Sequence, residues 1–216
     1  MSMLDVLAGV AEPMAAQPVV LTPVVQEPAK ATVSVIPYNA CLDPQADTFL
    51  PWLWKKMQAD DLVDYYFPGQ KDTGFATFVR LFSGDAQVAL FKIEDESLGK
   101  TWDDRIPGFI TWSQTRMGAS DVLIAGFIFF REFWDHHTTD HAAQAAFAYW
   151  FTNPEIKIVL GVCPSLHKAA MRYNQRIGLR EIGRIPMTHV YKGQTCDSIL
   201  YAITRDDWRA QCQQQP

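Results

Sequence analysis

The fold class of this chain is decided by residues 156–204, IKIVLGVCPSLHKAAMRYNQRIGLREIGRIPMTHVYKGQTCDSILYAIT. Residues 156–162 form an apolar run that is typical of a buried strand, and residues 164–177 place apolar side chains along one helical stripe. Working outward, residues 138–151 predict a helix and residues 121–130 a long apolar strand. A strand, a helix and a second strand in this order favour a parallel pair of strands.

Two further strands end the body of the chain, near 180–190 and 197–203, and a turn at Lys192-Gly193 joins them. Before residue 121, the sequence predicts strands at 32–37, 86–93 and 107–113 and helices at 45–67 and 72–82. The three consecutive strands at 86–93, 107–113 and 121–130 have short connections, which favour antiparallel pairing. We therefore expect an α/β fold with a mixed, mostly antiparallel central sheet and helices on both faces.

Residues 1–30 differ in composition from the rest, and we expect them to form an extended N-terminal arm ahead of one domain at 31–216. Four prolines recur in the arm at five-residue spacing, at Pro13, Pro18, Pro23 and Pro28. Proline removes a backbone donor and fixes φ, so this stretch fits neither a helix interior nor a central strand. We expect the arm to bind a protein partner or a second copy of the chain. A free tail without a partner remains the alternative.

Composition and charge exclude several classes of function. The net charge of −5 and the pI near 5.5 argue against general nucleic-acid binding, which requires a basic surface. No apolar run reaches the roughly 18 residues that a membrane span requires. The first residues lack the basic region of a signal peptide, so we expect a cytoplasmic protein. The four cysteines form no C-x-x-C pair, which argues against a zinc cluster.

Two stretches near the C-terminus carry a resemblance to a known family. The segment from His167 to Leu179, HKAAMRYNQRIGL, resembles the N-x-x-A-x-x-x-Y-x-x-x-G-F stretch of the GNAT (Gcn5-related N-acetyltransferase) superfamily. The segment Thr204-Arg205-Asp-Asp-Trp208 is similar to a Thr-Arg-Glu-Glu-Trp ending of phage-encoded GNAT-like proteins. The resemblance implies a GNAT-like fold over about residues 31–210, with acetyl-CoA as the cofactor.

The resemblance also implies where acetyl-CoA would bind. The cofactor-binding candidates are Ile128 and Phe130 at the end of a strand, and His136, His137, Thr138 and Thr139 at the start of a helix. One version of the family's loop reads W-G-x-G-x-A-x-E-A, and it aligns with Trp134 to Ala142. Glycines in such a loop let backbone N–H groups close on the pyrophosphate. Asp135 and His137 stand at both glycine positions, so the sequence predicts a degenerate acetyl-CoA loop.

The catalytic candidates that the resemblance implies are Tyr173 as a general acid and Glu132 as a general base. The family's tyrosine position, counted back from Gly178, holds Asn174 here, and Tyr173 comes one residue earlier on the apolar stripe. A core tyrosine is therefore the alternative for Tyr173. For Glu132, which follows the strand at 121–130, the alternative is a solvated surface carboxylate.

His136, His137 and His141 lie close together with Asp140, and histidines four residues apart share a helix face, as in many metal sites. No third ligand is evident in the sequence, so we assign no metal residues. Capping of the helix start by Asp135, Thr138 and Thr139 is the alternative role of this segment.

Two functions fit these observations. In the first, the protein keeps the GNAT fold with a degenerate acetyl-CoA loop and acts as a binding or structural protein in a phage virion or its assembly. In the second, it is an active acetyl-CoA-dependent N-acetyltransferase with an unusual loop.

Overall fold

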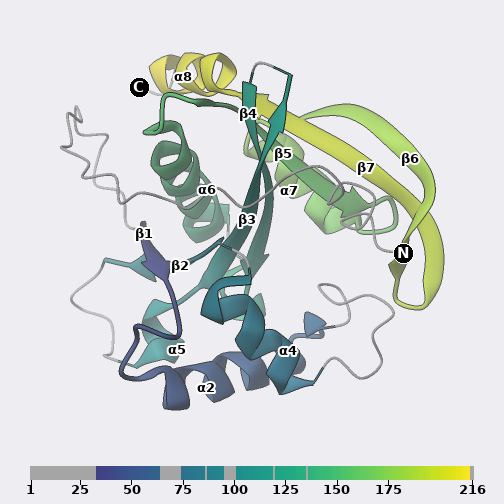
Figure 1. Cartoon of the computed structure of the whole chain (residues 1–216). Coiled ribbons are helices and arrows are strands. Elements are labelled where there is room, and N and C mark those ends of the chain that lie inside the picture. Colours follow the sequence, from purple (N-terminus) through teal and green to yellow (C-terminus); the bar gives the residue numbers. More distant parts are fainter. Residues whose placement is uncertain are drawn as a thin grey trace. The chain divides into compact units, whose positions relative to one another are not determined.

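The computed structural model describes residues 33–63, 74–85, 87–94, 101–118, 120–134 and 136–214, and for Asp85, His136, His137 and Gln214 it describes the backbone alone. The predicted arm at 1–30 therefore lies outside the described residues, as does Asp135. Figure 1 shows the arrangement of the elements along the chain. The strands are β1 (Val33–Tyr38), β2 (Gln87–Ile93), β3 (Gly108–Met117), β4 (Ser120–Phe129), β5 (Ile156–Pro164), β6 (Arg180–Tyr191) and β7 (Gln194–Thr204). The helices are α2 (Ala46–Ala59), α4 (Phe75–Arg80), α5 (Trp102–Arg105), α6 (His136–Phe151), α7 (Lys168–Arg176) and α8 (Arg205–Gln214), with short irregular turns η2 (Leu81–Asp85) and η3 (Arg131–Phe133).

The strands form one sheet in the order β1-β2-β3-β4-β5-β7-β6. Only β4 and β5 are parallel, and every other neighbouring pair is antiparallel. The predicted mixed, mostly antiparallel sheet is thus confirmed, including the parallel pair that the strand–helix–strand order favours. The predicted turn at Lys192-Gly193 is also confirmed: both residues have positive φ, which suits the right-handed twist of a two-residue hairpin.

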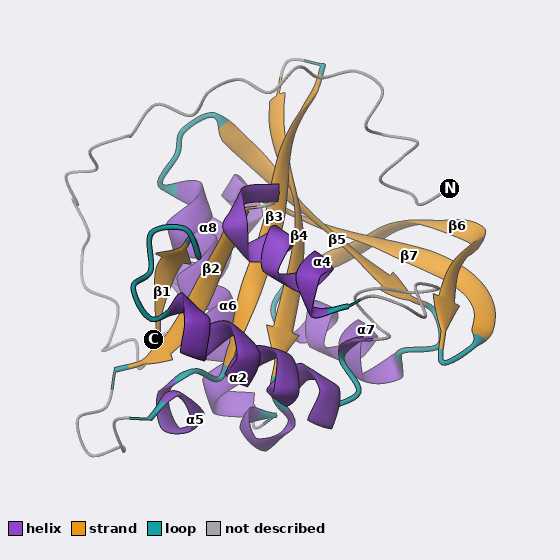
Figure 2. Cartoon of the chain, turned by 60° about the horizontal axis from the view of Figure 1, so that its bottom comes forward, coloured by secondary structure: helices purple, strands orange, loops and turns teal. Residues whose placement is uncertain are grey.

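Helices cover both faces of the sheet, as expected (Figure 2). On one face, α2 and α4 pack on β2, β3 and the end of β4 through buried residues such as Leu53, Phe78 and Phe109. On the other face, α6 contributes Ala146 and Phe147 to a second cluster, in which Trp208 of α8 is partly buried. Alternation along β4 explains both clusters, because successive side chains of a strand point to opposite faces.

The parallel strands β4 and β5 part before they end. Their pairing runs from Asp121 opposite Ile156 to Ala125 opposite Gly161 and then stops. Beyond that point β4 stays paired with β3 as far as Phe129, and β5 stays paired with β7 as far as Pro164. A gap between β4 and β5 therefore opens in the middle of the sheet.

One helix ends earlier than the sequence predicts, and two helices were not predicted. The helix expected at 45–67 ends at Ala59, because Asp61 takes a positive φ of 57° that no right-handed helix contains. The loop after β2 contains α5, which a capping box between Thr101 and Asp104 starts. The chain continues after β7 into α8, where Thr204 Oγ1 accepts a 3.1 Å hydrogen bond from the Asp207 N–H.

Among the described helices, none is long and apolar enough to span a membrane.

Candidate functional site

The predicted cofactor residues at the end of β4 are buried on the α2 side of the sheet. The exposed fractions are 1% for Ile128 and 0% for Phe130, and both side chains lie in the cluster with α2 and α4. The Phe130 N–H donates a 2.9 Å hydrogen bond to the Pro107 carbonyl, so its backbone faces the β3 side. Backbone groups alternate along a strand. The main-chain groups that face the gap therefore belong to Phe127 and Phe129, which the sequence analysis did not single out.

Trp134 contacts this gap-facing backbone. Its indole Nε1 donates a 3.0 Å hydrogen bond to the carbonyl oxygen of Phe129, while half of the Trp134 side chain stays exposed. One of the polar groups on the gap side of β4 is thus already bound by the chain itself.

The remaining predicted cofactor residues lie in the first turn of α6. His136 and His137 begin the helix, Thr138 is half-buried and Thr139 is buried. Two side chains of α7 reach this turn. The Tyr173 hydroxyl donates a 2.9 Å hydrogen bond to the Thr139 carbonyl. The Arg176 guanidinium donates to Asp140 at 2.9 Å and to Thr139 Oγ1 at 3.3 Å.

The Tyr173 ring lies against the part of β4 that β5 has left. Its centroid is 5.5 Å from that of Phe129 and 6.1 Å from that of Phe127, both in edge-on contact. Burial raises the pKa of the Tyr173 phenol well above its usual value. A phenol that holds its proton this firmly is a poor general acid near neutral pH.

The family's tyrosine position also has a structural contact here. Asn174 hydrogen-bonds the thiol of Cys163, which lies on β5 beyond the last β4–β5 pair. Burial nevertheless raises the pKa of the Cys163 thiol to about 11. Cys163 is therefore a neutral buried thiol and no reactive nucleophile.

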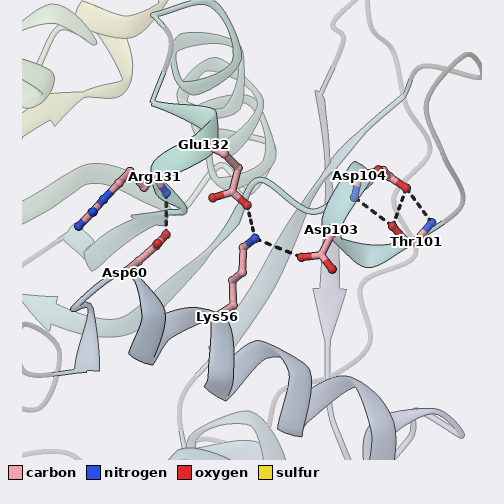
Figure 3. Close-up of polar contacts among 7 residues, drawn as sticks. All are labelled: Lys56, Asp60, Thr101, Asp103, Asp104, Arg131 and Glu132. Atoms are coloured by element: carbon pink, nitrogen blue, oxygen red, sulfur yellow. Dashed lines mark hydrogen bonds and ion pairs between the residues drawn. The ribbon is translucent and has the colours of Figure 1, made fainter.

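Glu132, the predicted general base, lies in η3 and forms an ion pair with Lys56 of α2 (Figure 3). The Lys56 ammonium also binds Asp103 of α5 at 3.1 Å, and it lies 5.8 Å from the centroid of the Phe130 ring. Burial lowers the pKa of Lys56, but its hydrogen bonds with Glu132 and Asp103 outweigh that effect, and the pKa is raised. Lys56 therefore stays protonated, and its contacts link α2, α5 and the loop after β4.

A second contact holds the same loop to α2. The Arg131 N–H donates a 2.6 Å hydrogen bond to Asp60 Oδ2 at the end of α2 (Figure 3). Sequence reasoning did not find Lys56, Asp60 or Arg176. In the sequence they are ordinary charged residues, and their partners lie far away along the chain.

A shallow pocket lies elsewhere, between the start of α2 and α4. Its volume is about 290 Å³, and its lining includes Cys41, Asp47 and Phe75. None of the predicted site residues lines it.

Comparison with solved structures identifies this architecture. A spermidine N-acetyltransferase from Vibrio cholerae in complex with CoA and spermine superposes with a TM-score of 0.64 at 11% identity, over 83% of this chain and 99% of the other. A GNAT-family acetyltransferase from Bacillus anthracis gives a TM-score of 0.60 at 16% identity, over 81% of this chain and 96% of the other. NAA60 from Arabidopsis thaliana in complex with acetyl-CoA gives a TM-score of 0.58 at 15% identity, over 81% of this chain and 99% of the other.

At the level of sequence, no family model matches the chain, and no curated protein matches it either. At 16% identity or less, these superpositions concern the fold. The chain therefore has the fold of the GNAT-family acetyltransferases.

Proposed function

We propose that this protein uses the GNAT fold as a binding or structural protein and that acetyl transfer is not its activity. The observation that carries the proposal is the place of Tyr173. Its ring packs on Phe127 and Phe129 where β4 and β5 part, and its hydroxyl is bonded to Thr139 in the first turn of α6. These contacts hold Tyr173 beside the first turn of α6, where the family resemblance would place acetyl-CoA, and they support a structural role for this residue.

Three further features support this proposal. Asp135 and His137 replace the glycines of the related loop, and a side chain there hinders a close approach of backbone to pyrophosphate. Arg176, the cation of α7 nearest to the first turn of α6, is neutralised by Asp140. Glu132 is ion-paired with Lys56. Tyr173 and Glu132, the two candidates for proton transfer, therefore both have partners within the fold.

The similarity of Thr204-Arg205-Asp-Asp-Trp208 to a phage-type ending suggests a setting for such a protein, in a phage particle or during its assembly. In that setting the GNAT domain would act as a scaffold for contacts with other proteins. Fold alone does not fix function.

Titration calorimetry with acetyl-CoA at about pH 7.5 tests the proposal. We expect a dissociation constant weaker than about 100 μM, equivalent to a binding free energy of about −5.5 kcal/mol or smaller in magnitude. The matched variant is Asp135→Gly combined with His137→Gly, which restores both glycines. Stronger binding by this variant would show that the loop side chains are the obstacle. Low-micromolar binding by the natural chain would contradict the proposal.

An active acetyl-CoA-dependent N-acetyltransferase is the second candidate. The observation that favours it is the parting of β4 and β5 in a fold that it shares with acetyltransferases solved with CoA or acetyl-CoA. In this case Tyr173 would have to release Thr139 to reach a ligand. Release of CoA from acetyl-CoA in the presence of a mixture of amine acceptors, lost in Tyr173→Phe without loss of fold, would favour this candidate.

A further inference from the structure

Positive charge is concentrated in one segment of an acidic chain. Residues 165–192 contain six Lys or Arg side chains and a single acidic residue, Glu181, although the whole chain has a net charge of −5. This segment comprises α7, the edge strand β6 and the start of the β6–β7 turn. Three of the six cations are neutralised by carboxylates: Arg176 by Asp140, Arg180 by Asp207 and Arg184 by Asp197.

The other three cations are Lys168, Arg172 and Lys192, and all three are exposed. Within the part of the chain that the structure describes, they form no ion pair. Lys168 and Arg172 are four residues apart on α7, so they are neighbours on one helix face. An unpaired, exposed pair of this kind attracts negative charge from outside the domain.

Lys192 belongs to the same region of the surface. The His167 ring, which caps the start of α7, lies 5.0 Å from the ring of Tyr191 in the hairpin. Figure 1 shows α7 beside the β6–β7 hairpin. Lys192 follows Tyr191 directly and lies close enough to His167 to lower the pKa of its imidazole. The positive end of the α7 macrodipole adds to this charge.

The region also exposes apolar side chains. Leu166 and Val190 are each 41% exposed, and they flank His167 and Tyr191 in the sequence. We refer to Leu166, Lys168, Arg172, Val190 and Lys192 together as the α7 surface. Because it combines unpaired cations with apolar groups, its natural partner is a segment that is both acidic and apolar.

The N-terminal arm has this composition. Residues 1–29 carry three acidic side chains, Asp5, Glu12 and Glu27, with no Lys or Arg, among Val, Leu and Ala residues. The four prolines restrict the unbound conformations of this arm, which lowers the entropy that it would lose on docking. We propose that the α7 surface binds the arm, residues 1–29, of a second copy of the chain.

This occupant fits better than a nucleic acid. Three unpaired cations are few compared with the six to ten phosphate contacts that a DNA-binding protein typically makes. The net charge of −5 adds long-range repulsion of a polyanion, whereas a short arm with three carboxylates matches three cations. The proposal concerns association between copies, and it stands or falls independently of acetyl-CoA binding.

Sedimentation velocity of the full chain at about 50 mM and about 500 mM NaCl is the test. Salt screens the attraction between exposed charges much more strongly at the higher concentration. We expect association at low salt that weakens at high salt. Lys168→Glu with Arg172→Glu should weaken association at least tenfold. The matched control is Lys55→Glu with Arg116→Glu, which reverses two exposed cations on other elements and should leave association unchanged.

A charge exchange makes the test specific for the arm. Asp5→Lys with Glu12→Lys should also weaken association, and adding these changes to Lys168→Glu with Arg172→Glu should restore it. Circular dichroism of each variant checks that the fold is kept. A monomer under all conditions, or an oligomer that the α7 reversal leaves unchanged, would overturn the proposal. So would binding of a labelled single-stranded oligonucleotide that the α7 reversal abolishes while self-association persists.

Discussion

The Tyr173 hydroxyl donates a 2.9 Å hydrogen bond to the main-chain carbonyl of Thr139, and this bond ties α7 to the first turn of α6. The Arg176–Asp140 ion pair joins the same two helices, three residues further along α7 and one residue further along α6. Both contacts join α6 and α7, and the Tyr173 ring packs on Phe127 and Phe129 beside the gap between β4 and β5. Because the proposed function rests on these contacts, they are the first to test.

Tyr173→Phe removes the hydroxyl and keeps the ring on Phe127 and Phe129. We expect the free energy of unfolding to fall by about 1 kcal/mol, the usual net worth of one hydrogen bond. Urea unfolding measures this change. Tyr149→Phe is the control, because within the described residues no hydrogen bond of its hydroxyl is found, and it should change stability by less than about 0.5 kcal/mol. Equal effects of the two changes would show that the Tyr173–Thr139 bond contributes nothing.

Lys56→Met removes the cation between Glu132 and Asp103 and retains most of the side-chain volume. The side chains of Lys56, Glu132 and Asp103 are 22%, 40% and 58% exposed, so solvent screens the pairs. We therefore expect a loss of only about 1 kcal/mol in the free energy of unfolding. Lys55→Met, on the exposed side of α2, is the control and should be neutral. The difference between the two variants should shrink as salt is added, and a difference that is independent of salt would contradict an ionic origin.

The sequence predicts the sheet well, because the hydrophobic pattern of each strand is local. The apolar runs at 121–130 and 156–162 identify β4 and β5, and the single helix between them indicates their parallel pairing. By contrast, the sequence prediction lacks α8, although a local signal for this helix is present. Thr204 and Asp207 are spaced as a helix start, but the segment was interpreted only as a family motif.

The candidate site is less predictable from sequence because its contacts join distant parts of the chain. The spacing places Tyr173 on the apolar stripe of α7, but its hydrogen-bond acceptor is a main-chain carbonyl of another helix. Lys56 and Glu132 meet only because α2 packs on the end of β4. No local pattern encodes such pairs. The roles proposed for Glu132, Tyr173 and the α6 residues stay predictions until ligand binding is measured.

We expect α8 to stabilise the fold through its contacts with α6 and β5. Trp208 packs on Phe151, with ring centroids 5.4 Å apart, and its Nε1 donates a 3.1 Å hydrogen bond to Gln144 Oε1. Trp208→Ala should lower the free energy of unfolding by about 2 kcal/mol, since the ring is only partly buried. Trp208→Phe keeps most of the packing and should cost about 1 kcal/mol for the lost hydrogen bond. A thermal unfolding experiment in which Trp208→Phe is less stable than Trp208→Ala would rule out this packing role.

The last prediction concerns the pH dependence of the α7 cap. His167 Nδ1 accepts a 3.1 Å hydrogen bond from the Ala170 N–H, and only the neutral imidazole has a lone pair for this bond. Burial lowers the pKa of His167, and the nearby Lys192 lowers it further. A protonated imidazole would also face the positive end of the helix macrodipole. The folded state therefore favours neutral His167.

The sign of the effect follows from linkage. With a folded-state pKa below the unfolded value of about 6.5, the unfolded chain takes up the proton first as the pH falls. The stabilisation by His167 is therefore complete above about pH 6.5 and declines as the pH falls from there toward the lowered pKa of the folded state. His167→Asn keeps a good capping side chain that does not titrate. Urea unfolding between about pH 5 and pH 8 should show the natural chain losing more stability than His167→Asn across this window, while carboxylates titrate alike in both. Parallel curves for the two proteins would mean that His167 does not couple protonation to the capping of α7.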